Sequence, residues 1–193
     1  MDHYVTLAGR AEARIKVERS EFLGIAVPAA AISDFLTELA AAEKKYYDAT
    51  HHCWAFRPFA GPDRSSDAGE PNGTAGKPIA NAIKGADLHD TGVVVVRWYG
   101  GVKLGTGGLS RAYHECAAAA LRDAPRVHRY VYKRIEVLVP FERLSDVYRL
   151  VAAPDVVLKG EEYGEQNVFS FDVRESQAEA FRRMLAEKRL AVR

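Results

Sequence analysis

The chain has 193 residues, and its 27 Lys and Arg against 26 Asp and Glu give a formal net charge of +1. With 48% hydrophobic and 27% charged residues, the composition is that of a globular protein with one large or two small domains, which excludes disordered, collagenous and fibrous classes. The near-balance of charge also excludes a generally basic protein held on nucleic acid by bulk charge. Any such binding must come from a local patch.

Cysteine content and hydropathy indicate the compartment. Cys53 and Cys116 are too few for a disulfide framework or a four-thiolate zinc site. The first 20 residues carry several charges and no apolar core, unlike a signal peptide. The longest apolar runs fall far short of the roughly 20 residues that a membrane-spanning helix needs. These features predict a reduced, soluble, cytoplasmic protein.

The first elements follow clear periodicities. Residues 13–17 and 22–27 alternate with period two around a charged bend, which predicts a hairpin. Apolar residues at helical spacing then predict a helix from an N-cap at Ser33 to about Tyr46.

The next segment returns to period two. Residues 48–59 predict a strand, with His51 and Cys53 on one face. The polar stretch 65–76 is too rich in Gly, Pro and Asn to form an element. Pro78 suits the first position of a short helix that reaches about Ala86.

The middle of the chain combines a buried strand with glycine-rich backbone. Residues 93–96 are an unbroken β-branched run, which predicts a strand covered on both faces. The glycine-rich segment 99–108 precedes a helix that begins near Leu109 and ends at Pro125, and residues 126–133 predict a strand.

The pattern changes at residue 134. A β-α-β-β-α-β order follows, with strands and helices expected at about 135–139, 141–151, 156–162, 167–174, 180–185 and 190–192. This order is that of the ferredoxin-like unit. We therefore expect an α+β protein with domains at 1–133 and 134–193.

Residues 69–78 superficially resemble a phosphate-binding loop. A Walker motif ending at Gly76 and Lys77 would need glycine where Pro71 stands and a hydroxyl where Pro78 stands. The motif therefore fails. A glycine-rich turn that opens a helix can still present N–H groups to an anion, with Lys77 as a neighbouring cation.

Residues 97–111 contain the strongest candidate site. This segment has three cations, Arg97, Lys103 and Arg111, and no acidic residue. Glycine-rich backbone before a helix can approach a phosphate closely, and aromatic rings can stack on bases. Tight turns beside a solvated helix face would give the same composition. The candidate binding residues are Arg97, Tyr99, Gly100, Gly101, Lys103, Gly105, Thr106, Gly107, Gly108 and Arg111, with Lys77 and His51 as weaker neighbours.

The His and Cys residues do not have the spacing that would bring three or four metal ligands together. On a helix, His114 and Cys116 would lie about 160° apart on opposite faces. On a strand only His51 and Cys53 share a face, whereas zinc takes three or four protein ligands. We predict no metal and no cofactor.

The sequence also offers few catalytic groups. No glycine elbow or spacing places a base beside either cysteine. Asp67 and Glu70, in the polar loop, are an acid/base pair for an alternative function as an enzyme, although solvated loop charges are far more common. We predict no catalytic residues.

Three motifs in this order, ATHHCWAF (49–56), SSDAGEPNGTAGKPI (65–79) and VVVVRWYGGVKLGTGGLSRAY (93–113), resemble the IMPACT family in its bacterial YigZ-type form. The resemblance implies an N-terminal domain folded like the second domain of ribosomal protein S5, followed by a ferredoxin-like domain. Eukaryotic members of the family restrain the amino-acid-starvation kinase by competing for its ribosome-associated activator.

The resemblance favours a non-catalytic regulator of translation or of its stress response. Its partner would be RNA, the ribosome or a ribosome-associated protein. Two alternatives stay open: a small-molecule or phosphate-ligand enzyme that uses the glycine-rich loops, and a pure protein-interaction adaptor.

Overall fold

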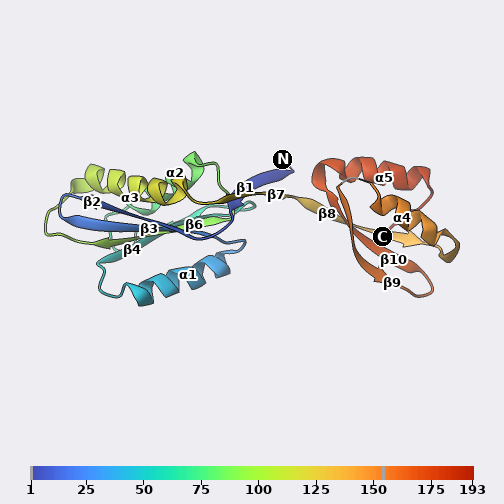
Figure 1. The fold of residues 1–193 in the computed structure, drawn as a ribbon, viewed down its shortest axis with the longest axis horizontal. Helices are drawn as coiled ribbons and strands as arrows, with labels where there is room; N and C mark the ends of the chain where they lie inside the picture. Colours follow the sequence, from blue (N-terminus) through green and yellow to red (C-terminus); the bar gives the residue numbers. More distant parts are fainter. Residues whose placement is uncertain (1, 154) are drawn as a thin grey trace. The chain divides into compact units, whose positions relative to one another are not determined.

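The computed structural model describes residues 2–153 and 155–193, and the chain divides into two compact units (Figure 1). The N-terminal unit spans Tyr4–His128, and the C-terminal unit comprises Arg129–Arg193 with Asp2 and His3. Residues 133 and 134, between which the sequence analysis divides the domains, both lie in strand β8 (Tyr132–Val139). One residue separates β7 (Arg126–Tyr130) from β8, so no loop marks the place where the two units meet.

A five-stranded sheet, in the order β2-β3-β6-β4-β5, forms the centre of the N-terminal unit. The strands are β2 (Ala11–Val17), β3 (Ser20–Pro28), β4 (His51–Arg57), β5 (Arg64–Ser66) and β6 (Thr91–Trp98). Helix α1 (Ile32–Lys45) covers one face, and α2 (Gly76–Gly85) and α3 (Gly105–Arg122) cover the other (Figure 1). The predicted hairpin is β2–β3, paired antiparallel from Ala11 opposite Ala26 to Val17 opposite Ser20.

The valine run is the middle strand, as its sequence predicts. β6 pairs antiparallel with both β3 and β4. Val93 and Val95 belong to the core under α2 and α3, whereas Val94 and Val96 belong to the core under α1. An unbroken β-branched run suits this position because both of its faces are buried.

Two helix starts differ from the sequence-based expectation. α1 begins after Ala31, whose N–H donates to the Asp34 carboxylate at 3.1 Å, so Ser33 is not the N-cap. α3 begins at Gly105 rather than near Leu109, so three glycines expected in a loop belong to its first turns. Glycine disfavours a helix by about 1 kcal/mol relative to alanine, which is why the pattern indicated a later start.

A two-stranded sheet of β1 (His3–Leu7) and β7 was not predicted. Its strands lie more than 100 residues apart in the chain, so no local periodicity identifies their pairing. The boundary between the two units falls within both strands.

The C-terminal unit has the expected β-α-β-β-α-β order, formed by β8, α4 (Leu144–Val151), β9 (Val156–Glu162), β10 (Asn167–Arg174), α5 (Ala178–Glu187) and β11 (Ala191–Val192). Short 3-10 turns, η1 (Phe141–Arg143) and η2 (Glu175–Gln177), precede the two helices. The sheet order β11-β8-β10-β9 is that of a ferredoxin-like fold. Both helices pack on the same apolar sheet face, around Phe171.

Candidate functional site

The candidate site begins where β6 ends and the chain turns into α3. Gly101 and Gly105 take φ values of +84° and +68°, a left-handed conformation that side chains other than glycine disfavour. Leu104 is the N-cap of α3 and makes no side-chain cap, and the first turn contains no acidic residue. The N–H groups of this turn, from Gly105 to Gly107, have no partner within the helix, and no carboxylate among the described residues accepts from them.

The other two helices of the N-terminal unit each have a carboxylate at their start. In α1, the Asp34 carboxylate accepts from the N–H of Ala31, the N-cap residue, rather than from an N–H of the first turn. Asp67 serves α2, because its carboxylate accepts hydrogen bonds from the backbone N–H groups of Gly73, Ala75 and Gly76 at 2.8–2.9 Å. Burial acts to raise the pKa of Asp67, but these hydrogen bonds outweigh it and hold the pKa below its ordinary value. Asp67 therefore fixes the loop that precedes α2.

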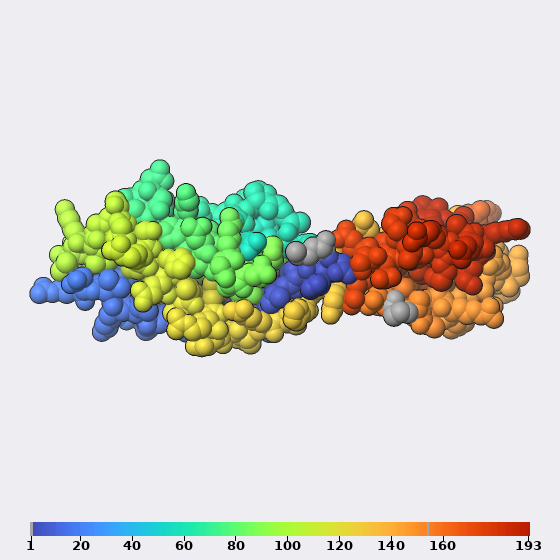
Figure 2. All heavy atoms as spheres, turned by 90° about the horizontal axis from the view of Figure 1, so that it is seen from above, coloured from blue at the N-terminus to red at the C-terminus, as the bar shows by residue number. Residues whose placement is uncertain are grey.

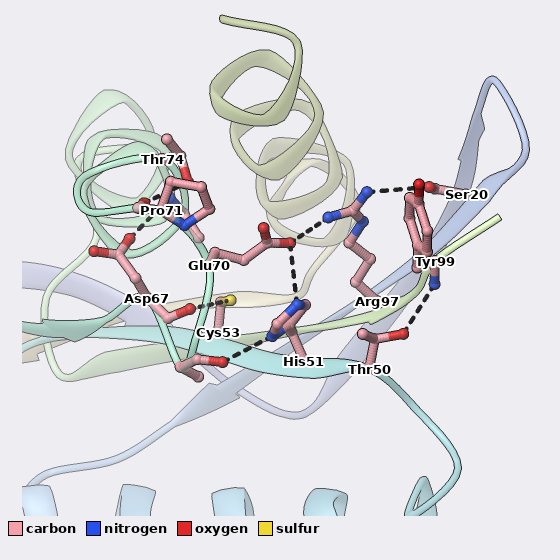
Figure 3. Close-up of polar contacts among 12 residues, drawn as sticks. Ser20, Thr50, His51, Cys53, Asp67, Glu70, Pro71, Thr74, Arg97 and Tyr99 are labelled. Atoms are coloured by element: carbon pink, nitrogen blue, oxygen red, sulfur yellow. Dashed lines mark hydrogen bonds and ion pairs between the residues drawn. The ribbon is translucent and has the colours of Figure 1, made fainter. Parts of the chain in front are cut away.

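A buried ion pair lies next to this loop. Arg97 on β6 donates from Nη1 to Glu70 Oε1 at 2.5 Å, and the side chains are 6% and 4% exposed. The Tyr113 hydroxyl of α3 donates to the same Glu70 oxygen at 2.7 Å. Glu70 thus joins the loop, the central strand and α3. Figure 3 shows its carboxylate directed toward the Arg97 guanidinium.

These contacts correct two expectations. Asp67 and Glu70 are not a solvated acid/base pair, because one caps a helix and the other is buried against Arg97. Arg97 does not lie on the surface, since it is 5% exposed. No local sequence signal reveals this pairing, because Glu70, Arg97 and Tyr113 are separated by 27 and 43 residues and lie on three different elements.

The weaker candidates His51 and Lys77, and the thiol of Cys53, also have defined places. His51 Nδ1 lies 2.9 Å from the Ala68 carbonyl oxygen, and its Nε2 lies 4.0 Å from Glu70 Oε1, so this ring supports the loop from below (Figure 3). Cys53 is fully buried and donates from Sγ to the Asp67 carbonyl oxygen. Lys77 is exposed in the first turn of α2.

Three cavities lie along the N-terminal half of α3. The N-terminal cavity, of about 260 Å³, is lined by Glu70, Pro71, Arg97, Tyr99, Lys103, Leu104, Gly105, Thr106 and Leu109. The hairpin cavity, of about 330 Å³, shares Lys103 and Leu104 with it and adds Arg111 and the turn between β2 and β3. A third cavity, of about 370 Å³ between α2 and α3, shares Arg111 and Glu115. We call the three together the α3 surface.

The structure brings only some of the predicted residues to the α3 surface. Arg97, Tyr99, Lys103, Gly105, Thr106, Gly108 and Arg111 line it, whereas Lys77 and His51 do not. In Figure 2 the yellow-green residues of α3 lie between the blue β2–β3 hairpin and the green residues of α2, and α3 packs against both.

The glycines of this segment have different roles. A Cβ at Gly100 would overlap the backbone of Arg19, and one at Gly108 would lie 3.1 Å from Leu104 Cβ, so both positions are packed. Gly101 and Gly105 serve the turn through their positive φ. Neither close packing nor a positive φ explains the glycine at position 107. The atom nearest to a Cβ there would be Arg111 Nη1 at 3.7 Å.

Metal-ligating side chains are dispersed in this structure. Within residues 2–153 and 155–193, no group of three or more His, Cys, Asp or Glu side chains could hold a metal ion. Among the helices of the same residues, none has the length and apolarity needed to cross a membrane.

Comparisons with known proteins identify the family. The family model of the Impact N-terminal domain matches residues 18–121. An IMPACT family member in the pol 5′ region of Thermus thermophilus is 44% identical over 138 residues, 71% of this chain and 74% of that protein. YvyE of Bacillus subtilis (strain 168) is 31% identical over 194 residues, 95% and 86% of the two chains.

Two further comparisons give one more relative and one structure of the same fold. YigZ of Escherichia coli (strain K12) is 36% identical over 121 residues, covering 60% of this chain and 59% of that protein. The crystal structure of a hypothetical protein matches in fold with a TM-score of 0.76 at 24% identity, covering 100% of this chain and 97% of that one. From the family match and the identity to YvyE, the chain belongs to the IMPACT family.

Proposed function

We propose that this protein binds RNA, free or within the ribosome, through the α3 surface, and that it acts there as a regulator of translation. One observation carries the proposal. Three adjoining cavities follow the first half of α3, and the exposed cations Lys103 and Arg111 line the places where neighbouring cavities meet. A single RNA strand needs such a succession of phosphate contacts.

The charges of the α3 surface support an anionic partner. Lys103 and Arg111 form no salt bridge within the described part of the chain, so both charges are available to a ligand. Arg97 contributes little net charge, because Glu70 neutralises it. Glu18 and Glu115 line the hairpin cavity and offset part of the attraction. Binding is therefore expected to be local, salt-sensitive and moderate in affinity.

The link to translation rests on family membership. The resemblance to eukaryotic IMPACT proteins implies a partner on or near the ribosome. A fold alone does not determine a function, so the proposal needs a direct test in the organism's own extract.

Ribosome co-sedimentation from a lysate at low and high salt is this test. Wild-type protein is expected to sediment with ribosomes at low salt and to be released at high salt or after nuclease treatment. The variant with Lys103→Ala and Arg111→Ala should lose most of this association. A matched control replaces Lys44 and Lys45, two exposed cations of α1 on the opposite face of the sheet, by Ala. The proposal fails if the two double variants behave alike.

A protein-interaction adaptor is the second candidate, and the C-terminal unit favours it. Phe141 and Tyr148 are 77% and 80% exposed. Phe141 also lines a cavity of about 380 Å³ at the ends of β8 and β10. Exposed aromatic side chains are typical anchors of protein interfaces. Association that resists nuclease, depends weakly on salt and is lost in Phe141→Ser would favour this function.

A further inference from the structure

We propose that the N-terminal cavity of α3 is a site for one ribonucleotide unit, with its phosphate on the first turn of α3, its base against Tyr99 and a ribose hydroxyl on Glu70. The inference deepens the proposed function and rests on it, since the remaining α3 surface would hold the neighbouring nucleotides of an RNA strand. A free nucleotide offers the same chemistry.

The phosphate position follows from the start of α3. Among the residues that the structure describes, no carboxylate accepts from the N–H groups of its first turn, whereas Asp67 accepts from Ala75 and Gly76 at the start of α2. Neither the backbone conformation of Gly107 nor its packing requires glycine, because a Cβ there would make only an ordinary contact with Arg111 Nη1 at 3.7 Å. Because glycine weakens a helix, its presence there is explained by a ligand that approaches the backbone. Lys103 lines the same cavity and adds a positive charge.

Arg97 is a second, independent indication of a ligand. Its side chain is 6% exposed and lines the cavity. Nη1 donates to Glu70, and Nη2 donates to Ser20 Oγ at a long 3.3 Å. Nε is buried and has no hydrogen-bond partner among the described residues. Leaving a buried donor of a cation unsatisfied is costly, and a ribose oxygen of a ligand in the cavity would reduce that cost by accepting from Nε.

Glu70 supplies the selectivity. Both hydrogen bonds that it accepts, from Arg97 and Tyr113, go to Oε1. Within the residues that the structure describes, Oε2 accepts none, and Glu70 lines the cavity. An ionised carboxylate accepts hydrogen bonds only, so a ligand must offer a donor here. The 2′-hydroxyl of ribose is such a donor, and it is the group that distinguishes RNA from DNA.

The size of the cavity limits the ligand to one unit. About 260 Å³ is slightly less than the roughly 300–1,000 Å³ typical of sites that enclose a whole drug-sized molecule. Tyr99 lines the cavity and is 45% exposed, so its ring offers a stacking surface for the base at the mouth.

The test is a titration of ¹⁵N-labelled full-length protein, followed by amide chemical shifts. The probes are adenosine 5′-monophosphate, its 2′-deoxy counterpart, and 12-residue oligoadenylates made of RNA and of DNA, both with 5′-hydroxyl ends. We expect saturable shifts of the amide signals of Gly105, Thr106 and Gly107. The ribose form of the probe that binds is expected to have about tenfold higher affinity than the deoxy form, because one hydrogen bond to a charged acceptor contributes about that much.

A pair of matched variants separates ligand binding from structure. Thr106→Asp places a carboxylate at the second residue of α3, where it would occupy the anion position and favour the helix. Ser33→Asp makes the same change at the second residue of α1. We expect Thr106→Asp to lose at least tenfold in affinity with an unchanged or raised melting temperature, and Ser33→Asp to retain both. If Thr106→Asp does not fold, Gly107→Asp replaces it.

The outcomes distinguish the two proposals. Saturation by the mononucleotide identifies a free nucleotide as the source, and saturation by the RNA 12-mer alone identifies a strand; either supports the site. RNA that binds without moving the amides of Gly105 to Gly107, or ribose and deoxyribose probes of equal affinity, overturns this inference and leaves the proposed function standing. Nucleotide binding at these amides without any RNA affinity supports the site and contradicts the proposed function.

Discussion

Replacing Arg97 by Met is expected to destabilise the N-terminal unit by about 3–5 kcal/mol, the typical cost of removing one partner from a buried ion pair. The side chains of Arg97 and Glu70 are 6% and 4% exposed, so both charges are largely removed from water. Without Arg97, the Glu70 carboxylate retains one hydrogen bond, from the Tyr113 hydroxyl, and His51 Nε2 at 4.0 Å. Since domains are stable by roughly 5–15 kcal/mol, this loss is a large fraction of the total.

Urea unfolding followed by tryptophan fluorescence measures this loss. The only two tryptophans, Trp54 and Trp98, both lie in the N-terminal unit, so their emission reports on that unit. The double variant with Arg97→Met and Glu70→Gln contains no buried charge at this place. It is expected to be more stable than the sum of the two single losses by about 2 kcal/mol or more. A cost below about 1 kcal/mol for Arg97→Met, or single losses that simply add, would refute the buried pair.

Asp67→Ala should lower the stability of the N-terminal unit by about 2–4 kcal/mol, because α2 loses its cap and buried N–H groups lose their acceptor. Since the pKa of Asp67 is lowered in the folded state, its contribution is full above the unfolded carboxyl pKa of about 3.9 and is lost as the pH falls through the lower folded value. Acid titration of the variant should lack that step, and an unchanged acid transition would contradict the capping role. Burial raises the pKa of the Cys53 and Cys116 thiols to about 12, so neither should react with a thiol reagent at pH 8 until urea unfolds the protein; rapid labelling of native protein would show the burial to be wrong. Gly92→Ala should destabilise by roughly 3 kcal/mol or more, since a Cβ there would overlap the Phe35 ring, and Phe35→Leu should recover part of the loss; a neutral Gly92→Ala in thermal unfolding would disprove this close packing.

Much of the fold could be predicted because its signals are local. Periodicity within a few residues is enough to recognise the β2–β3 hairpin, the valine strand β6 and the C-terminal β-α-β-β-α-β unit. The pairing of β1 with β7 could not be predicted, because it joins distant parts of the chain. The start of α3 was also predicted wrongly, since packing overrides the low helix propensity of its glycines.

The sequence predicted where the candidate site lies, but not which of its cations are exposed. The sequence identified Lys103 and Arg111 as cations near glycine-rich backbone, and both line the α3 surface. It could not identify Arg97 as buried, because its partner Glu70 comes from a loop 27 residues earlier. To interpret a run of cations as one patch is to assume that all of them face solvent. Arg97 does not, because it lies on β6 where this strand is still buried in the core.

The salt dependence of RNA binding tests the central claim most directly. Purified wild-type protein and the variant with Lys103→Ala and Arg111→Ala would be titrated with single-stranded RNA at several salt concentrations. Arg97 is left intact, because its loss would unfold the site. The variant is expected to bind more weakly, and its log–log salt slope should be smaller by about 1.4, at ~0.7 per phosphate contact. Equal slopes, or no affinity of the wild-type protein for RNA at low salt, would contradict RNA binding at the α3 surface.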